Sequence, residues 1–172
     1  TLGTSVEEDV EVWHETDNTF SCGVWKTKSD KYIVIGSFQT LSQEYQVLNA
    51  NEPTGKFRMI QPRERNLEYS IAHFEDKFYI RTNLDAKNFR LMSTPETATT
   101  KENWTEVIPH RTDVLFEGMD IFKDYLVLTE RKNGIIQLRV RPWKGEEHYI
   151  AFEEDAYVAY TSANPEFDTN IL

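Results

Sequence analysis

Cysteine is scarce in this sequence, and its scarcity limits the chemistry that the chain can perform. Cys22 is the one cysteine among 172 residues, so an intrachain disulfide and a multi-cysteine metal site are both excluded. A single thiol also favours a reducing compartment. No apolar run approaches the length of a membrane span, and no signal peptide is visible. We therefore expect a cytoplasmic protein without a membrane partner.

Positive charge is scarce relative to negative charge. The chain has 19 Lys and Arg against 29 Asp and Glu, which gives a formal net charge of -10. Nucleic-acid binding needs clustered Lys and Arg to neutralise phosphates, so this composition argues against a nucleic-acid partner. A short basic peptide suits an acidic chain better.

Motifs for catalysis and cofactor binding are also missing. The nearest approach to a Gly-x-Ser-x-Gly nucleophile elbow is Gly3–Ser5, where Glu7 occupies the place of the second Gly. The sequence contains no phosphate-cradling Gly loop and no dinucleotide fingerprint. Four histidines lack the spacing of metal ligands, and we expect each to be a surface or turn imidazole: His14, His73, His110 and His148. We therefore predict no catalytic residue, no metal site and no cofactor within this chain.

The sequence does contain a repeat. The segment Asp30–Ile35 recurs as Asp76–Arg81 and again as Lys123–Leu128, at intervals of about 46 residues. Each period holds four strand-like runs separated by turn residues, and Asn133-Gly134 in the third period is a strong hairpin signal. Four antiparallel strands in a repeat of this length are typical of a β-propeller blade. The sequence thus predicts an all-β fold, a partial β-propeller of about three to four blades with four antiparallel strands each.

The repeats also predict where the blades lie. We place blades near residues 18–62, 67–109 and 114–152, with a further blade starting at 155–172. Val10–His14 is expected to supply the outer strand of a preceding blade, and Tyr157–Leu172 to open the following one. Propellers usually close with about four to eight blades. We therefore interpret residues 1–172 as a fragment of a propeller domain from a longer protein.

Aromatic residues recur at one place in the blade. Tyr32, Phe78 and Tyr125 hold equivalent positions, as packing between adjacent sheets requires. Trp25 and Trp104 lie in strand-like runs and are predicted to belong to the core. Trp143 lies in a turn between the third and fourth strands of its period.

Longer stretches of the sequence indicate a family. From about Glu11 onward the chain resembles the propeller of the oligopeptidase B (protease II) branch of the prolyl oligopeptidase family of serine peptidases. The stretches that carry the resemblance are Pro62–Asn83, Ala86–Leu91, Trp104–Pro109, Glu130–Gly134, Leu138–Arg139 and Tyr157–Glu166.

This resemblance implies a cytoplasmic serine peptidase that cuts short peptides after Arg or Lys. In that family a propeller caps an α/β-hydrolase domain and excludes large folded proteins. The family's Ser, Asp and His lie in the hydrolase domain, so no triad residue is carried over to this chain. The implied role is a gate and substrate filter that is inactive alone, and the implied partners are the hydrolase domain of the same parent chain and short basic peptides.

The candidate site residues lie in loops. In propellers, the loops that lead into the innermost strands crowd one end of the central channel, and the loops between second and third strands share that end. The candidates are Arg63, Arg65 and Glu68, then Asn83, Asp85 and Lys87, then Arg111 and Asp113. These charges are suited to pairing with a hydrolase domain or steering a cationic peptide. The alternative is that they are solvated turn residues or ion pairs between blades.

Two further expectations follow from the repeat. A stand-alone propeller that binds partners through its loops is the alternative to a peptidase segment, and composition alone does not separate the two. An incomplete ring also exposes apolar blade faces and strand edges. We expect the chain to self-associate through these surfaces.

Overall fold

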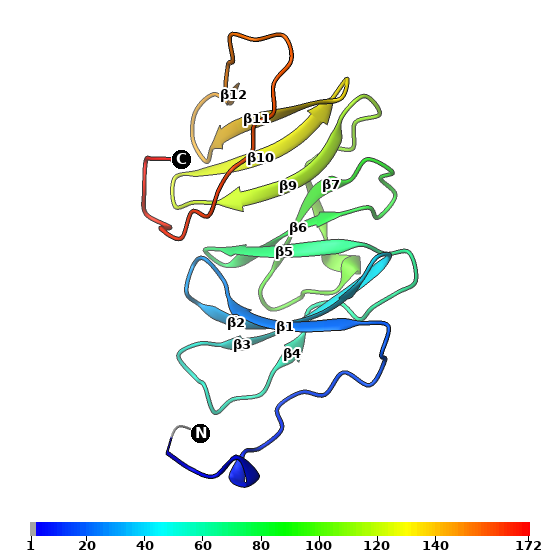
Figure 1. Cartoon of the computed structure of the whole chain (residues 1–172), viewed down its shortest axis with the longest axis vertical. Coiled ribbons are helices and arrows are strands. Elements are labelled where there is room, and N and C mark those ends of the chain that lie inside the picture. The colour runs from blue at the N-terminus through cyan, green and yellow to red at the C-terminus, as the bar shows by residue number, and fades with distance from the viewer. Residues whose placement is uncertain (1–2) are drawn as a thin grey trace.

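The fold is built almost entirely from β-strands. The computed structural model describes residues 3–172; residues 1 and 2 of the predicted fragment lie outside this range. Within residues 3–172, three four-stranded antiparallel sheets are accompanied by two short 3-10 helices, η1 (Val6–Glu8) and η2 (Lys101–Asn103). No helix in the described part is long and apolar enough to cross a membrane. The predicted all-β fold, a partial β-propeller, is confirmed (Figure 1).

The three sheets, which we call blades 1 to 3, follow one another along the chain. Blade 1 consists of β1 (Ser21–Lys26), β2 (Tyr32–Gln39), β3 (Ser42–Asn49) and β4 (Arg58–Met59). Blade 2 consists of β5 (Tyr69–Phe74), β6 (Lys77–Thr82), β7 (Arg90–Pro95) and β8 (Thr105–Ile108). Blade 3 consists of β9 (Leu115–Ile121), β10 (Tyr125–Lys132), β11 (Ile135–Pro142) and β12 (His148–Tyr149). Strands pair in chain order within each blade, and the blades are stacked along the long axis (Figure 1).

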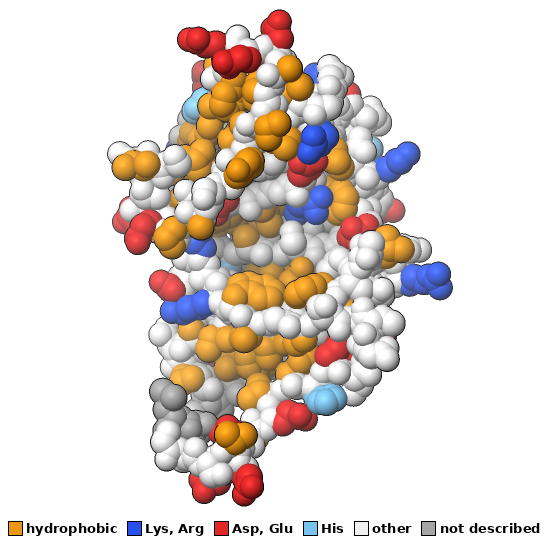
Figure 2. All heavy atoms as spheres, in the orientation of Figure 1, with side chains coloured by type: hydrophobic (Ala, Val, Ile, Leu, Met, Phe, Trp, Pro, Cys, Tyr) orange, Lys and Arg blue, Asp and Glu red, His pale blue; other side chains and the backbone are white. Residues whose placement is uncertain are grey.

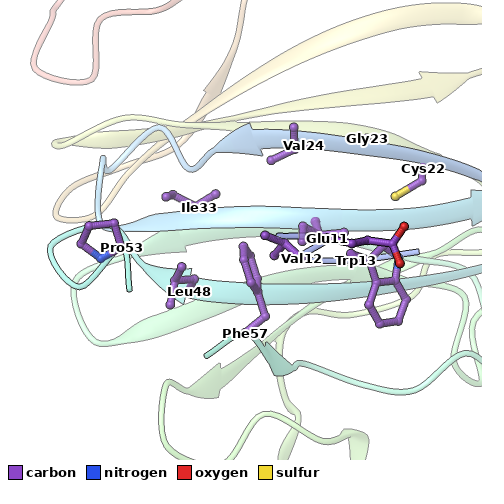
Figure 3. A pocket seen from close by; sticks show the side chains of 11 residues that line it. Glu11, Val12, Trp13, Cys22, Gly23, Val24, Ile33, Leu48, Pro53 and Phe57 are labelled. Atoms are coloured by element: carbon purple, nitrogen blue, oxygen red, sulfur yellow. The ribbon is translucent and has the colours of Figure 1, made fainter. Parts of the chain in front are cut away.

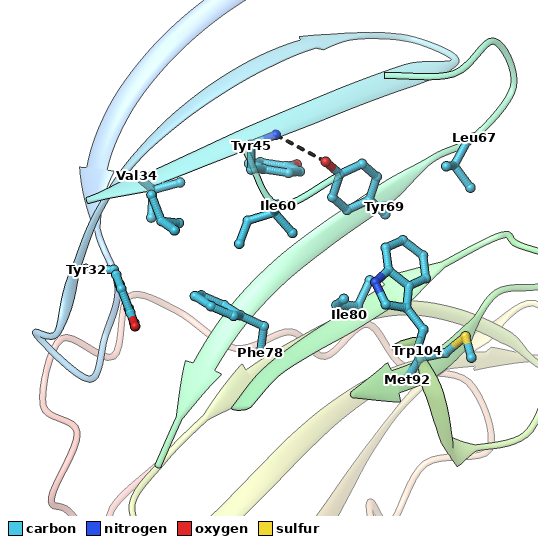
Figure 4. Close-up of a cluster of buried hydrophobic side chains, with 11 residues drawn as sticks. Tyr32, Val34, Tyr45, Ile60, Leu67, Tyr69, Phe78, Ile80, Met92 and Trp104 are labelled. Atoms are coloured by element: carbon cyan, nitrogen blue, oxygen red, sulfur yellow. Dashed lines mark hydrogen bonds between the residues drawn. The ribbon is translucent and has the colours of Figure 1, made fainter. Parts of the chain in front are cut away.

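Alternating side chains let blade 2 pack on both neighbours. In β6, Phe78, Ile80 and Thr82 are buried on one face while Tyr79 and Arg81 point to the other. The first face meets blade 1 in a core that contains Tyr32, Val34, Tyr45, Val47, Ile60, Leu67, Tyr69, Phe78, Ile80, Met92 and Trp104 (Figure 4). The second face meets blade 3 through Leu91, Ile108, Phe116, Ile121, Leu126 and Leu128. Burial on both faces therefore fixes the stacking order of the blades.

The aromatic predictions hold in part. Tyr32 and Phe78 are buried with ring centroids 5.2 Å apart, and Trp104 is buried as expected. Tyr125 is half-buried and stacks on the neighbouring ring of Phe122. The prediction for Trp25 is wrong, because this side chain is 40% exposed on the edge strand β1.

Gly36 accommodates the Trp25 ring. A Cβ atom added at Gly36 would lie 2.5 Å from a ring carbon of Trp25, which is closer than packed carbon atoms approach. The indole edge also meets the Tyr45 ring at a centroid distance of 6.0 Å. Glycine at position 36 therefore leaves the space that the Trp25 ring of the edge strand occupies.

The hairpin predicted at Asn133-Gly134 is confirmed. Lys132 pairs with Ile135 across the turn, and Asn133 and Gly134 have φ values of 49° and 85°. Positive φ at both central residues is the geometry that Asn-Gly favours in two-residue hairpins.

The two terminal segments depart from the prediction. Residues 10–14 and 157–172 form no strand within the described part of the chain. Val10 and Val12 are largely exposed. The C-terminal segment lies against the junction of blades 2 and 3, where the Lys123 amide donates to the Phe167 carbonyl at 3.0 Å. The Phe167 ring packs near Phe74 of blade 2.

Candidate functional site

The predicted site residues lie at one end of the blade stack. We call the end at which β1, β5 and β9 begin the upstream end, and the end at which they finish the downstream end. Strand β5 contacts both β3 of blade 1 and β9 of blade 3, so its first residues lie near both neighbours. The loops that precede β5 and β9 meet the β6–β7 loop at the upstream end, because antiparallel pairing sets Tyr69 opposite Thr82.

Glu68 and Asn83 are brought together as a hydrogen-bonded pair. The Asn83 side chain accepts from the Glu68 amide at 2.9 Å and donates to the Glu68 carboxylate at 3.2 Å. It also donates to the Asn66 carbonyl at 3.0 Å. Asn83 therefore holds the loop before β5 against the loop after β6 and fixes the direction of the Glu68 carboxylate.

Arg63 is occupied by two carboxylates. Its guanidinium lies 2.9 Å from Glu15 and 2.8 Å from Glu44 and 4.0 Å from the ring centroid of Phe20. Burial raises the pKa of Glu15, but hydrogen bonds from the Asp17 amide and the Arg63 guanidinium help to outweigh burial and leave this pKa lowered. These contacts attach the link between blades 1 and 2 to the segment before β1.

Arg65, Asp85 and Lys87 differ from Arg63 in being exposed. Arg65 lines a shallow hollow of about 370 Å³ beside Phe20, Leu41 and Asn66. Asp85 has a φ of 50° in the turn closed by the Ala86 amide and the Asn83 carbonyl. These three side chains extend from the upstream end into solvent.

Arg111 and Asp113 lie together on blade 3. The Arg111 guanidinium is 3.7 Å from Asp113 and 3.6 Å from the buried carboxylate of Glu130. The hydrogen bond from Lys132 is the largest effect that lowers the pKa of Asp113. Glu130 also pairs with Arg139, so Arg111 belongs to an ion network within blade 3. The eight candidates thus fall into three groups: exposed charges, members of structural ion pairs, and the hydrogen-bonded pair of Glu68 and Asn83.

Arg81 of β6 is a half-buried cation that no sequence pattern singled out, and the charges of Glu68 and Glu117 act on it. Its Nε donates to the Phe116 carbonyl at 2.7 Å, and its guanidinium lies 3.6 Å from the centroid of the Phe89 ring. Burial lowers the pKa of Arg81, and the charges of Glu68 and Glu117 partly offset that effect. The available signal was the alternation of β6, which turns Arg81 toward blade 3.

The expectation of a surface or turn imidazole is wrong for His73. This side chain is 2% exposed because β5 turns it toward blade 1. Its Nδ1 lies 2.7 Å from Ser29 Oγ, and its Nε2 lies 2.6 Å from Glu96. These contacts join blades 1 and 2 at the downstream end.

Lys28 makes a longer connection at the same end. Its ammonium lies 2.8 Å from Asp120 of β9 and 3.3 Å from the ring centroid of Phe122. The loop between β1 and β2 thus reaches past blade 2 to blade 3. No cluster of three or more metal-ligating side chains occurs among residues 3–172.

The outer face of blade 1 carries an apolar groove. Val24, Ile33, Leu48 and Phe57 line a hollow of about 570 Å³, and Figure 3 shows these side chains. Val12 approaches it from the segment before β1. Figure 2 shows hydrophobic side chains gathered around β1 in the lower half of the view. This face corresponds to the side of blade 1 that packs against no other described blade.

Stacked four-stranded antiparallel meanders define this chain as part of a β-propeller. The family described as the N-terminal β-propeller domain of prolyl oligopeptidase matches residues 1–172. The chain belongs to this family, which confirms the resemblance found in its sequence.

The chain matches proteins that are much longer than itself. The chain is 38% identical to dipeptidyl aminopeptidase BI of Pseudoxanthomonas mexicana over 99% of its own length and 24% of the relative. It is 29% identical to Protease 2 of Moraxella lacunata over 98% of its length and 24% of that protein. Oligopeptidase B from Trypanosoma brucei, solved in a closed form with covalently bound antipain, matches with a TM-score of 0.87 and 25% identity. This match covers 98% of the chain and 25% of the solved one. The chain thus spans about a quarter of the length of these relatives.

Proposed function

We propose that this chain is the propeller segment of a cytoplasmic serine oligopeptidase, in which it gates the access of short basic peptides to an α/β-hydrolase domain of the same parent chain. The observation that carries this proposal is the match of the whole chain to about a quarter of each peptidase relative. In this proposal the catalytic triad belongs to the hydrolase domain. The propeller segment contributes no catalytic residue; it limits access to the hydrolase domain and presents charged side chains to the peptide.

The upstream end has the chemistry that suits such a gate. Glu68 and Glu117 are half-buried carboxylates whose charges act on Arg81. Glu117 is paired with Arg131 at 2.6 Å, whereas Asn83 fixes the direction of Glu68. A cationic peptide side chain would gain attraction from carboxylates held in place before it arrives. Arg81 limits that attraction, because it partly neutralises both acids.

A charge-removing pair of variants tests this surface. In the full-length peptidase, we expect Glu68→Gln to reduce kcat/KM for a short cationic peptide by about two- to tenfold at low salt, and by less at high salt. Glu75→Gln is the matched control, because Glu75 is an exposed acid in the turn at the downstream end. Equal effects of the two variants, or an equal loss for a neutral peptide, would contradict a role for Glu68 in steering.

The activity proposed for the parent protein is cleavage of short peptides after Arg or Lys, and the relatives suggest a second possible activity. The relative at 38% identity is described as a dipeptidyl aminopeptidase, whereas the one at 29% is described as a protease. An enzyme of the first kind would need a free amino terminus on its substrate. Release of dipeptides is therefore the second candidate activity for the parent protein.

Two reporter substrates separate these activities. The full-length protein should hydrolyse an amino-blocked peptide after Arg or Lys, and the chain of residues 1–172 alone should hydrolyse neither reporter. Activity confined to unblocked dipeptidyl reporters would favour the second candidate. Hydrolysis by the isolated chain would contradict the proposal that the propeller segment is inactive alone. A parent protein without a hydrolase domain would favour the alternative of a stand-alone interaction module.

A further inference from the structure

Four polar side chains connect blades 1 and 2 at the downstream end. Ser29 and Lys31 come from the turn between β1 and β2, His73 from β5, and Glu96 from the residue after β7. The His73 ring bonds Ser29 on one side and Glu96 on the other, and Lys31 pairs with the same Glu96 oxygen. We call these four residues the interblade latch.

Aromatic rings enclose the imidazole. The ring centroids of Tyr32 and Phe78 lie 5.0 Å and 5.1 Å from that of His73. The side chain of His73 is 1% exposed, compared with 19% for Glu96. Water therefore has little access to His73, and the two hydrogen bonds must satisfy its nitrogens.

Charged groups face this pocket from each packed element. Blade 1 contributes Lys31 next to the imidazole and Arg58, whose guanidinium lies 5.8 Å from the Tyr32 ring centroid. Blade 2 contributes Glu96 and Asp76, which both favour a protonated imidazole, while Lys31 opposes it. Burial is the largest effect and leaves the pKa of His73 lowered.

A neutral imidazole can make both hydrogen bonds of this arrangement, one with Ser29 and one with Glu96. If Nε2 carries the proton, it donates to Glu96, and Nδ1 accepts from the Ser29 hydroxyl. Burial raises the pKa of Glu96, but hydrogen bonds from Lys31 and His73 outweigh it and leave that pKa lowered. The closed latch therefore contains neutral His73, an ionised Glu96 and a charged Lys31.

The latch differs from a nucleophilic Ser–His–carboxylate triad. In such a triad the serine meets Nε2 and the carboxylate meets Nδ1, whereas Ser29 meets Nδ1 and Glu96 meets Nε2. Glu96 is also shared with Lys31. The geometry suits a structural contact between blades.

We propose that Ser29, Lys31, His73 and Glu96 hold blades 1 and 2 together at neutral pH and release them on acidification. Protonation adds a charge to an enclosed site between aromatic rings, and separation of the blades gives that charge access to water. Protonation of Glu96 then removes the ion pair with Lys31. Protonation of His73 and protonation of Glu96 therefore both weaken the contact between blades 1 and 2.

The pH range follows from the direction of each shift. Because the pKa of His73 in the folded chain lies below its ordinary value of 6.5, its contribution to stability is complete above that pH and is lost as the pH falls through the folded value. The contribution of Glu96 is complete above its ordinary value of 4.5 and is lost below its own lowered pKa. Loosening thus starts below pH 6.5 with His73 and increases at lower pH with Glu96.

Urea unfolding at pH 7.5 and pH 5.5 tests the proposal. We expect the midpoint of the unmodified chain to fall by about 0.5 M more than that of His73→Gln, because Gln supplies a donor and an acceptor without titrating. His148→Gln is the matched control, because His148 is exposed on β12, and it should behave as the unmodified chain does. An identical pH dependence in His73→Gln and the unmodified chain would overturn the proposal.

Proton NMR covers the case in which His73→Gln does not fold. Titration of the four imidazoles in the unmodified chain should give a midpoint below 6.5 for His73. Amide signals of residues 27–32 and 69–74 should shift with that same midpoint, because the two blades separate there. A midpoint at or above 6.5, or amide signals that ignore the titration, would contradict the latch.

Discussion

The hydroxyl of Tyr69 bonds the main-chain amide of Tyr45 in the neighbouring blade (Figure 4). The amide donates to the hydroxyl at 3.2 Å, and the hydroxyl donates to the Gln61 carbonyl at 2.5 Å. Burial raises the pKa of Tyr45 to about 12 and raises that of Tyr69 as well. The Tyr69 hydroxyl therefore remains protonated near neutral pH and bridges blade 2 to the backbone that follows blade 1.

Removing this hydroxyl should destabilise the blade junction. We expect Tyr69→Phe to lower the free energy of unfolding by about 1–3 kcal/mol, because a buried amide and a buried carbonyl each lose a partner. Chemical denaturation measures the change. Tyr160→Phe is the control, since Tyr160 is exposed, and a loss of equal size in both variants would argue against the bridge.

Lys28 and Asp120 should be energetically coupled across blade 2. Both side chains are mostly buried, at 17% and 27% exposure, so solvent screens their attraction incompletely. A double-mutant cycle with Lys28→Met and Asp120→Asn should give a coupling energy of about 0.5–2 kcal/mol.

The Lys123–Asp168 pair is the control for that cycle. Its atoms lie 2.6 Å apart, but the side chains are 53% and 70% exposed. We expect no measurable coupling there, because solvent and salt screen exposed pairs. Equal coupling in both cycles would show that Lys28 does not act as a link between blades.

The outer face of blade 1 should promote self-association of the isolated chain. The groove around Val24, Ile33 and Phe57 is apolar and open (Figure 3). Exposed apolar surfaces of this kind promote association with other proteins or with copies of the same chain. Sedimentation should show a dimer or larger species at high concentration, and Val24→Lys should shift it toward monomer. Thr112→Lys adds the same charge at an exposed site on blade 3 and should leave association unchanged. A monomer that binds no hydrophobic dye would contradict this prediction.

The repeat allowed the blades to be predicted because it is local. Equivalent aromatic residues such as Tyr32 and Phe78 indicate which face of each strand is buried, and Asn133-Gly134 indicates a two-residue hairpin turn. The segment Val10–His14 has the same alternation of apolar and polar residues but forms no strand. Such a pattern indicates which side of a strand would be buried, but a strand also needs a neighbouring strand to pair with.

The site was harder to predict because its contacts cross between blades. Glu68 and Asn83 were found because strand pairing alone brings their loops together. Arg81 and His73 were missed because each lies in a strand and meets partners on a different blade. Only the stacking of the sheets shows that Arg81 meets the backbone of blade 3 and that His73 is enclosed between blades 1 and 2.

We propose that the propeller also limits by size which substrates reach the hydrolase domain, and a paired cleavage assay on the full-length protein tests this most directly. The same Arg-containing site is placed in a short peptide and in an exposed loop of a folded protein, and the two rates of cleavage are compared. We expect rapid cleavage of the peptide and no cleavage of the folded protein. Equal rates for the two substrates would contradict it.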